Sequence, residues 1–329
     1  MANLLAENGP VRLYARRPEV VRAMQGDRMS AGYSLHPNVT PTNDLSEVAT
    51  CRVLFPIVAS SGFRQTMQDL APYLRPSHLL IHGTKGLDVR DPAPDSAHPR
   101  VLTREQVRTM SEVIREETVV VRIGCLAGPN LARELGEHQP AATVVASHFD
   151  EVIDTGQRLL RSDRFQVYGN HDLIGVELCG VLKNIIAIAS GTLSGLGLGE
   201  NARALLISRG LAEMIYLGKA LGGESDAFMG LAGVGDLVAT CASRHSRNFT
   251  VGYRLAQGET LADITRDTEE LAEGVNTTRI VKQLADYYHV AAPITRMLYR
   301  MLFESVTAEK ALEKLMKIPL GEGEDVDFL

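Results

Sequence analysis

A lysine and an asparagine interrupt an otherwise apolar stretch that runs from Gly175 to Ser190. Burying an ammonium group without a partner is very costly. A chain tolerates a buried lysine when the charge is paired, when its pKa is shifted, or when the group works in a cleft. Lys183 is therefore a candidate acid or base, and Asn184 beside it is a candidate hydrogen-bonding residue.

The same stretch has two distinct faces when it is wound as a helix. One face is small and polar, which predicts a wall of a substrate pocket, and the other is apolar, which predicts core. The first face holds Gly180, Lys183 or Asn184, Ala187 and Gly191, and the second holds Leu182, Ile185, Ile186 and Ala189.

Strands and helices alternate through the first half of the chain. This alternation is typical of crossover units and of a parallel sheet that is covered on both faces. We therefore expect an α/β, doubly wound, Rossmann-like domain with a mostly parallel sheet over residues 1–169. The predicted strands are Val11–Ala15, Val53–Ala59, Leu79–Gly83, Val119–Leu126, Thr143–Ser147 and Phe165–Tyr168, and the predicted helices begin at Pro18, cover Gly62–Leu74, and run from Arg104 to about Glu117 behind a capping box.

The second half, from about His171, has no convincing strand pattern. It predicts an all-α, substrate-binding domain over residues 170–329. Its clearest helical segments are Leu173–Ser190, Asn201–Leu221, Thr277–Tyr288 and Ala308–Met316.

A dinucleotide-binding sheet normally opens with a strand and a glycine-rich turn, G-x-G-x-x-G, that holds the pyrophosphate. The first residues contain no such turn, and Met1 to Gly9 resembles the end of a helix. We expect that roughly the first strand and turn, about 15–20 residues of a typical unit, are missing here. The strands on either side would then lack hydrogen-bond partners.

Length, charge and cysteine content exclude several classes of protein. The chain has 329 residues, which suggests two domains, and a net charge of −6 with no long basic patch, so we expect no nucleic-acid partner. The apolar stretch around Lys183 carries charges, so we expect no membrane span. The four cysteines show no metal-binding spacing, and we expect no metal and reduced thiols in the cytoplasm.

Four short motifs follow one another in a specific order. They are Gly83-Thr-Lys-Gly86, Gly128-Pro-Asn-Leu-Ala132, Gly180-Val-Leu-Lys-Asn184, and Gly235-Asp-Leu-Val-Ala-Thr-Cys241 followed by Ser246-Arg-Asn248. This ordered set resembles the bacterial NAD(P)-dependent glycerol-3-phosphate dehydrogenases, from Met1 almost to the C-terminus. The chain departs from the family in lacking the glycine turn and in having Asn130 where many members have serine.

The resemblance implies interconversion of dihydroxyacetone phosphate and sn-glycerol 3-phosphate, which supplies glycerol 3-phosphate for phospholipid synthesis. It implies that Lys183 is the acid or base, that Asp236 is its partner, and that Lys85 aids the reacting oxygen. The guanidinium of Arg247 offers a fork of donors that suits a phosphate. The substrate-binding residues implied by the resemblance are Lys85, Gly128, Asn130, Lys183, Asn184, Asp236, Thr240, Ser246, Arg247 and Asn248.

The implied cofactor is NADP or NAD. Arginine accommodates the 2′-phosphate of NADP, and no acid follows the predicted strand at Val11–Ala15, so Arg16 and Arg17 favour NADP. The other cofactor-binding residues implied by the resemblance are Lys85, Ala132, Arg247, Leu271 and Glu273.

Two alternatives remain open on the sequence alone. One is a related two-domain dehydrogenase that acts on another hydroxy acid, and the other is an inactive homologue without a nucleotide site. An in-frame upstream strand with a glycine-rich turn would favour the enzyme, and an interrupting stop codon would favour the inactive form. We expect a small-molecule substrate both for a glycerol-3-phosphate dehydrogenase and for the related dehydrogenase. A homodimer is a candidate assembly.

Overall fold

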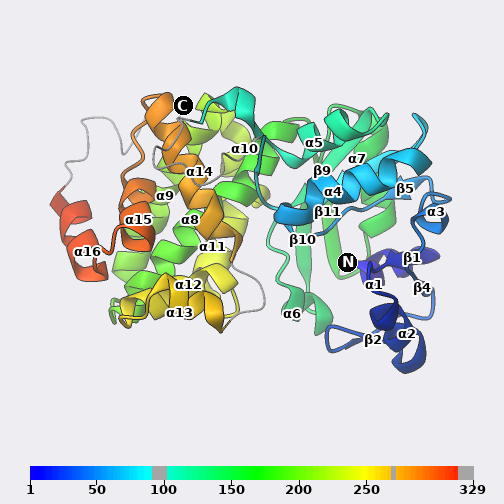
Figure 1. Ribbon diagram of the computed structural model, residues 1–329, viewed down its shortest axis with the longest axis horizontal. Helices are drawn as coiled ribbons and strands as arrows, with labels where there is room; N and C mark the ends of the chain where they lie inside the picture. The colour runs from blue at the N-terminus through cyan, green and yellow to red at the C-terminus, as the bar shows by residue number, and fades with distance from the viewer. Residues whose placement is uncertain (91–101, 268–271, 318–329) are drawn as a thin grey trace. The chain divides into compact units, whose positions relative to one another are not determined.

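The computed structural model describes residues 1–90, 102–267 and 272–317, and its contacts divide the chain into two compact units (Figure 1). The first unit comprises Met1–Thr84 and Met110–Leu173, and the second comprises Lys85–Thr109 and Ile174–Leu329. The sequence predicts two continuous domains, 1–169 and 170–329, whereas Lys85–Thr109 groups with the second unit. Part of the reason is a hydrogen bond of 3.0 Å from Thr109 Oγ1 to the buried carboxylate of Glu177.

The first unit is an α/β structure in which a sheet lies between helices. Its hydrogen-bonded order is β11-β10-β9-β6-β5, and neighbours are parallel except for β9 and β10. The elements are α1 (Ala2–Ala6), β1 (Val11–Tyr14), α2 (Pro18–Asp27), β2 (Met29–Ser30), β3 (Tyr33–Ser34), β4 (Val39–Thr42), α3 (Leu45–Val48), β5 (Val53–Leu54), α4 (Ser60–Leu70), a 3-10 turn (Ala71–Tyr73), β6 (Leu79–His82), α5 (Met110–Glu117), β9 (Arg122–Ala127), α6 (Ala132–Gly136), β10 (Ala141–Ala146), α7 (Asp150–Leu160) and β11 (Phe165–Asn170).

Apolar clusters cover both faces of this sheet. On one face, the side chains of α4 and α5 pack with β-strand residues around Phe63 and Ile114. On the other, α7 and α1 pack around Ile81 and Phe165. Strands that are buried on both faces need nearly continuous apolar sequence, and this pattern is what predicts β6 and β9.

The strands β1 and β4 form a separate, parallel two-stranded sheet. The helix α1 packs against both sheets, because Leu4 belongs to the cluster of the larger sheet and Ala6 to a cluster with Val39. The backbone N–H groups of Val11 and Ala15 donate to carbonyls on the β4 side. Alternate residues of a strand face opposite neighbours, so Arg12 and Tyr14 point their backbone groups away from β4.

In the edge strand β5, alternate residues likewise point their backbone groups away from the paired strand. The N–H groups of Leu79 and Gly83 donate to the carbonyls of Arg52 and Pro56. The backbone groups of Val53 and Phe55 therefore point away from β6. Among the described residues, β1 pairs with β4 and β5 pairs with β6, so the two strands lie in different sheets.

Two predicted elements differ from the structure. The strand predicted over Val53–Ala59 ends at Leu54, because Pro56 has no N–H to donate to a ladder. The capping box at Thr103 exists, but it begins only a 3-10 turn, Arg104–Gln106, and not a helix to Glu117. The next residues form β8 (Val107–Arg108), which pairs antiparallel with β7 (Asp88–Val89), and α5 starts only at Met110.

The second unit is helical apart from that short hairpin, as predicted. Its elements beyond the hairpin are α8 (Leu173–Gly195), α9 (Glu200–Ala220), α10 (Ser225–Met229), a π-helical turn (Leu231–Gly235), α11 (Asp236–Ala242), α12 (Arg247–Ala256), α13 (Leu261–Arg266), α14 (Glu273–Tyr287), α15 (Pro293–Phe303) and α16 (Ala308–Lys317).

The long helix α8 is the core of the second unit. It is apolar and long enough to cross a membrane by length and composition, but 89% of its most apolar window is buried inside the protein. Its small face has two uses. A Cβ on Gly191 would lie 1.9 Å from the carbonyl oxygen of Phe249, so this end of the face lets α12 approach closely. A Cβ on Gly180 would instead meet the side chain of Lys85.

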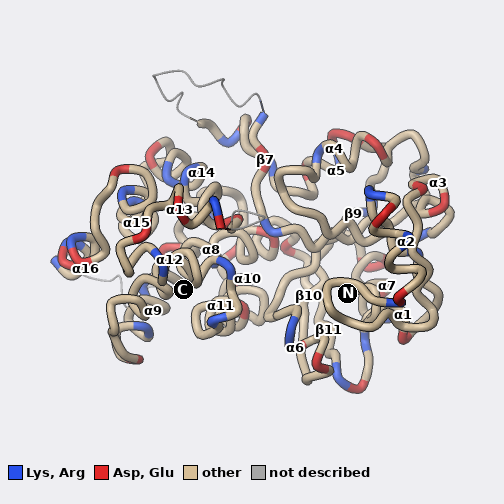
Figure 2. Tube along the Cα trace, turned by 60° about the horizontal axis from the view of Figure 1, so that its bottom comes forward, with Lys and Arg blue, Asp and Glu red and all other residues tan. Residues whose placement is uncertain are grey.

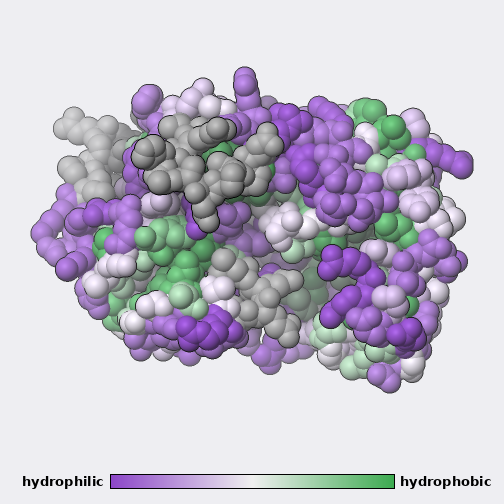
Figure 3. Space-filling model, in the orientation of Figure 1, coloured by the Kyte–Doolittle hydropathy of each residue, from purple (hydrophilic) through white to green (hydrophobic). Residues whose placement is uncertain are grey.

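Acidic and basic residues are interspersed along both units (Figure 2). On the face in Figure 3, apolar side chains gather beside α15 within the second unit.

Candidate active site

Two lysines share one carboxylate in the second unit. Lys183 Nζ donates to Asp236 Oδ1 and, at 2.6 Å, to Thr240 Oγ1. Lys85 Nζ donates to Asp236 Oδ2 at 2.8 Å. Thr240 also donates to Asp236 Oδ1 at 3.2 Å, so its hydroxyl has a fixed direction. The structure thus brings together the predicted residues Lys85, Lys183, Asp236 and Thr240.

Burial and charge set the protonation of this cluster. Burial lowers the pKa of Lys183 to about 7, and the positive charge of Lys85 adds to this effect while Asp236 opposes it. Burial alone would raise the pKa of Asp236, but the charges and hydrogen bonds of Lys85 and Lys183 outweigh it and lower that pKa. A lysine with a pKa near neutrality can both give and take a proton at physiological pH.

Local structure explains how these side chains meet. Asp236 is the first residue of α11, directly after the π-helical turn, and Thr240 lies one turn later on the same face. π-helical turns occur often at functional sites. Gly180 leaves room for the stem of Lys85, whose aliphatic carbons would lie 3.4 to 3.7 Å from a Cβ at that position.

A chain of amides connects three helices beside this cluster. Asn184 Nδ2 donates to the carbonyl of Gly180 at 3.3 Å, and Asn248 Nδ2 donates to Asn184 Oδ1 at 3.0 Å. Asn248 Oδ1 in turn accepts from the backbone N–H of Gly274 at 3.0 Å. Asn184 and Asn248 are both buried, so these bonds are shielded from water.

The predicted phosphate residues begin helix α12. Ser246 is the N-cap, and its hydroxyl accepts from the N–H of Phe249 at 3.4 Å. Arg247 is the first helical residue and is exposed. The start of a helix carries a partial positive charge and unpaired N–H groups, which attract anions.

In the first unit, Gly128 and Asn130 follow strand β9. Gly128 has a φ of 150°, and a Cβ there would meet the backbone of Thr143 at 3.0 Å. Asn130 Nδ2 donates to Thr143 Oγ1 at 2.9 Å, and that hydroxyl donates to the carbonyl of Ala127. Because the hydroxyl hydrogen is committed to Ala127, Asn130 must offer its NH₂ group to Thr143. Its Oδ1 is buried and has no hydrogen-bond partner among the described residues.

The remaining predicted cofactor residues are spread over both units. Arg16 and Arg17 are exposed and lie just after β1, with Ala15 between, and Arg17 Nε lies 3.9 Å from a carboxylate oxygen of Glu19. Ala132 is exposed at the start of α6, and Glu273 is the first residue of α14. Leu271 lies outside the described residues.

No group of histidine, cysteine and acidic side chains that could hold a metal ion occurs within the described ranges. The four cysteines are free thiols, and burial raises the pKa of Cys241 to about 12, which makes that thiol unreactive.

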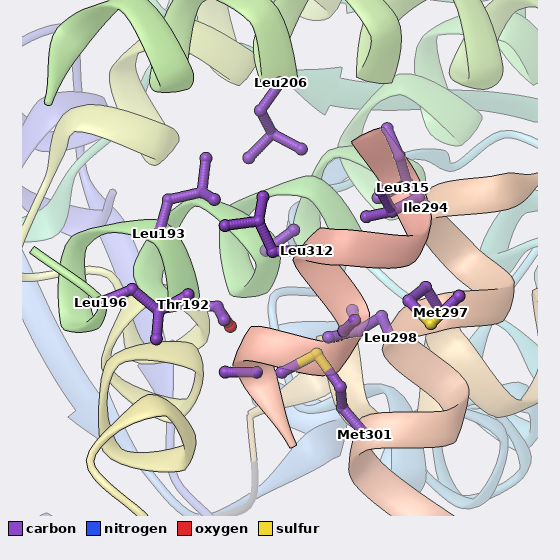
Figure 4. A pocket seen from close by; sticks show the side chains of 13 residues that line it. Thr192, Leu193, Leu196, Leu206, Ile294, Met297, Leu298, Met301, Leu312 and Leu315 are labelled. Carbon is purple, nitrogen blue, oxygen red and sulfur yellow. The ribbon is translucent and has the colours of Figure 1, made fainter. Parts of the chain in front are cut away.

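A separate hollow of about 40 Å³ lies in the second unit among helices α8, α9, α15 and α16 (Figure 4). Side chains such as Leu193, Leu312 and Met301 line it, and Thr192 is its one polar residue. It includes none of the predicted site residues, and its apolar lining does not suit a phosphorylated substrate.

Sequence reasoning missed two residues that hold this machinery in place. Thr143 orients Asn130, but a threonine within a predicted strand carries no signal of such a role. Gly274 offered a signal, because glycine is unfavourable inside a helix. A Cβ there would lie 2.5 Å from Asn248 Oδ1 and 2.9 Å from the carbonyl oxygen of Asn184.

Two family models match the chain. The model of the NAD-dependent glycerol-3-phosphate dehydrogenase N-terminus matches residues 1–153, and that of the C-terminus matches residues 172–313.

Individual relatives agree. Glycerol-3-phosphate dehydrogenase (NAD(P)+) of Pseudomonas aeruginosa is 40% identical over 336 residues, which cover 100% of this chain and 93% of the relative. The enzyme of Pseudomonas fluorescens is 40% identical with the same coverage. The crystal structure of the glycerol-3-phosphate dehydrogenase of Coxiella burnetii matches with a TM-score of 0.85 and 32% identity, over 96% of this chain and 94% of that one.

Proposed function

We propose a mechanism based on Lys183 for this chain, which belongs to the family of NAD-dependent glycerol-3-phosphate dehydrogenases. The chain is an oxidoreductase of glycerol 3-phosphate that uses NAD or NADP. The observation that carries the proposal is a buried amine with two of its three N–H bonds directed at Asp236 and Thr240.

In this proposal, the third N–H of Lys183 is the reacting one. When dihydroxyacetone phosphate is reduced, negative charge develops on the oxygen of the middle carbon, and Lys183 transfers its proton to that oxygen to complete the alcohol. The neutral amine keeps its bonds to Asp236 and Thr240 and takes the proton back when glycerol 3-phosphate is oxidised. A pKa of about 7 suits both directions.

Lys85 has a different part. It holds the second oxygen of Asp236, so its charge stands close to Lys183 without occupying the same oxygen. That charge makes Lys183 a stronger acid and stabilises negative charge on the reacting oxygen. About a quarter of the Lys85 side chain is exposed, so it can reach a ligand.

The substrate's phosphate would bind at the start of α12. Arg247 supplies a planar fork of donors, Ser246 supplies a hydroxyl, and the helix supplies backbone N–H groups and a positive dipole end.

The described residues fit one end of the cofactor. Two exposed guanidinium groups, Arg16 and Arg17, follow the C-terminal end of a parallel strand, where such sheets bind nucleotides. They suit a 2′-phosphate, which supports NADP, and Ala132, Leu271 and Glu273 remain proposed contacts. The cofactor, when bound, supplies or accepts the hydride. None of the described residues forms a glycine-rich pyrophosphate turn.

Asn130 would contact a hydroxyl group. One N–H of its NH₂ group is used by Thr143, and we expect its buried oxygen, which has no partner among the described residues, to accept from the ligand. An acceptor suits an O–H of the glycerol backbone and repels a phosphate oxygen. Gly128, with no side chain, would leave space beside it. In the second unit, Asn184 and Asn248 remain proposed substrate contacts.

The enzyme would act in the cytoplasm, supplying glycerol 3-phosphate for phospholipid synthesis. It would act on a small molecule without nucleic acid or membrane, with a homodimer as the candidate assembly.

The test is a cofactor-oxidation assay with two ketones, dihydroxyacetone phosphate and dihydroxyacetone, on the unaltered chain and on Arg247→Ala. We expect the unaltered chain to prefer the phosphorylated ketone, and Arg247→Ala to raise its KM by about 100-fold, as expected for a lost charge-assisted pair. The control is Arg115→Ala, which removes an exposed arginine that is distant from Arg247 in the sequence. A near-normal KM in Arg247→Ala would refute the phosphate contact.

A further inference from the structure

Asn248 has its side chain engaged within the protein on both sides. Its Oδ1 accepts from Gly274 N–H and its Nδ2 donates to Asn184 Oδ1. Asn248 is the second residue of α12, next to Arg247, and Gly274 is the second residue of α14, next to Glu273. One side chain therefore joins the start of the proposed phosphate-binding helix to the start of the helix that begins at Glu273.

The bond to Gly274 performs a capping function. The first N–H groups of a helix have no partner within the helix, and the N-cap residue of α14 is Ala272, which has no side-chain acceptor. Asn248 supplies that acceptor from another helix. The fit is tight, because a Cβ on Gly274 would lie 2.5 Å from Asn248 Oδ1. Asn248 can keep this position only while α12 and α14 keep theirs.

The other bond reaches the catalytic helix. Asn184 is the neighbour of Lys183 on α8, and its own NH₂ group donates to the carbonyl of Gly180. A displacement of α12 would therefore change the hydrogen bonds that Asn248 makes to α14 and to Asn184, the neighbour of Lys183. All of these atoms belong to the second unit.

We infer that Asn248 is a positioning residue that couples binding of the substrate's phosphate at Arg247 to the order of the first turn of α14, where Glu273 would contact the cofactor. This inference rests on the proposed roles of Arg247 and Glu273. It assigns to Asn248 a function beyond that of a direct substrate contact: phosphate bound at the start of α12 would also hold in place the acceptor that caps α14.

Amide hydrogen exchange of α14 tests the coupling without the cofactor, with sn-glycerol 3-phosphate as the probe. In the unaltered chain, the probe should slow exchange of the Gly274 amide by about tenfold, a typical size for coupling between sites. Asn248→Ala should abolish the slowing, although calorimetry should still detect binding of the probe. Asn248→Asp keeps an acceptor oxygen for Gly274 and should restore protection of that amide.

Two further variants separate coupling from damage to the fold. Gly274→Ala breaks the same contact from the other side and should also abolish the slowing. Asn276→Ala removes an exposed asparagine of the same helix and should leave it intact. If Asn248→Ala weakens binding of the probe but Gly274 is still protected by it, Asn248 is only a ligand contact and the inference is overturned. If the probe binds equally well to Arg247→Ala, the proposed phosphate site has failed instead.

Discussion

The two units hold their polar side chains in different states. In the second unit, Lys183, Asp236 and Thr240 are buried and bonded to one another. In the first, Asn130 presents a buried oxygen without a partner among the described residues, and Arg16 and Arg17 are exposed. The groups proposed for proton transfer are therefore bonded to one another within the protein, whereas the Asn130 oxygen and the two guanidinium groups of the first unit are proposed to meet a ligand. Preassembled charges cost no reorganisation during the reaction.

Removing the amine should have the largest effect. Lys183→Met in the second unit should lower kcat by about 10²–10⁴-fold, which is the contribution of a positioned acid or base, with little change in cofactor affinity. Steady-state assays and a fluorescence titration of the reduced cofactor measure the two quantities. Lys219→Met, which alters an exposed lysine of α9, is the control. Unchanged turnover would remove Lys183 from the mechanism.

Removing the shared carboxylate should destabilise the assembled cluster. Asp236→Asn leaves two ammonium groups without their anion, and we expect the free energy of unfolding to fall by about 3–5 kcal/mol. Denaturant unfolding measures the loss. Glu200→Gln breaks an exposed pair with Arg203 and should cost about 0–1 kcal/mol. Equal losses in the two variants would mean that the cluster is not preassembled.

Removing the second lysine should shift the pH dependence of the reaction. Reduction needs protonated Lys183, so its rate falls as the pH rises through about 7, while oxidation needs the neutral amine and rises over the same range. Lys85 lowers the pKa of Lys183, so Lys85→Met should move both inflections to higher pH. Rate profiles in both directions measure this shift, and an inflection that moves to lower pH would contradict the electrostatic role.

The smallest effect should come from the first unit. Asn130→Ala removes one hydrogen bond to a neutral hydroxyl and should raise the substrate KM about fivefold, corresponding to about 1 kcal/mol. Thr143→Val should have a similar effect, because it removes the acceptor that orients Asn130 together with the hydroxyl's own bond to the carbonyl of Ala127. A change in Asn130→Ala without any in Thr143→Val would show that the oxygen is not directed by Thr143.

The sequence predicted which side chains meet around Lys183 better than it predicted the connections that support them. A lysine within an apolar helix is conspicuous because its burial is so costly, and the ordered motifs identified its partners. The capping box at Thr103 wrongly predicted a long helix. The strand that follows it forms because Val107 pairs with Val89, and a local sequence pattern does not show such a distant pairing. The short strand β4 was missed because Pro41 interrupts it. The amide bridge from Asn248 to Gly274 joins residues far apart in the chain, and no periodicity marks such a pair.

The separate pairing of β1 with β4 has a consequence for how the protein opens. Residues 11–42 share no backbone ladder with the five-stranded sheet in the described part of the chain, and the apolar cluster that they form with Ala6 is small, built around Met24, Leu35 and Val39. Segments with few buried contacts open at a lower free energy than the rest of a protein. This amino-terminal part should therefore detach as its own subglobal step, giving a protease its first cleavage there while the helical half remains folded.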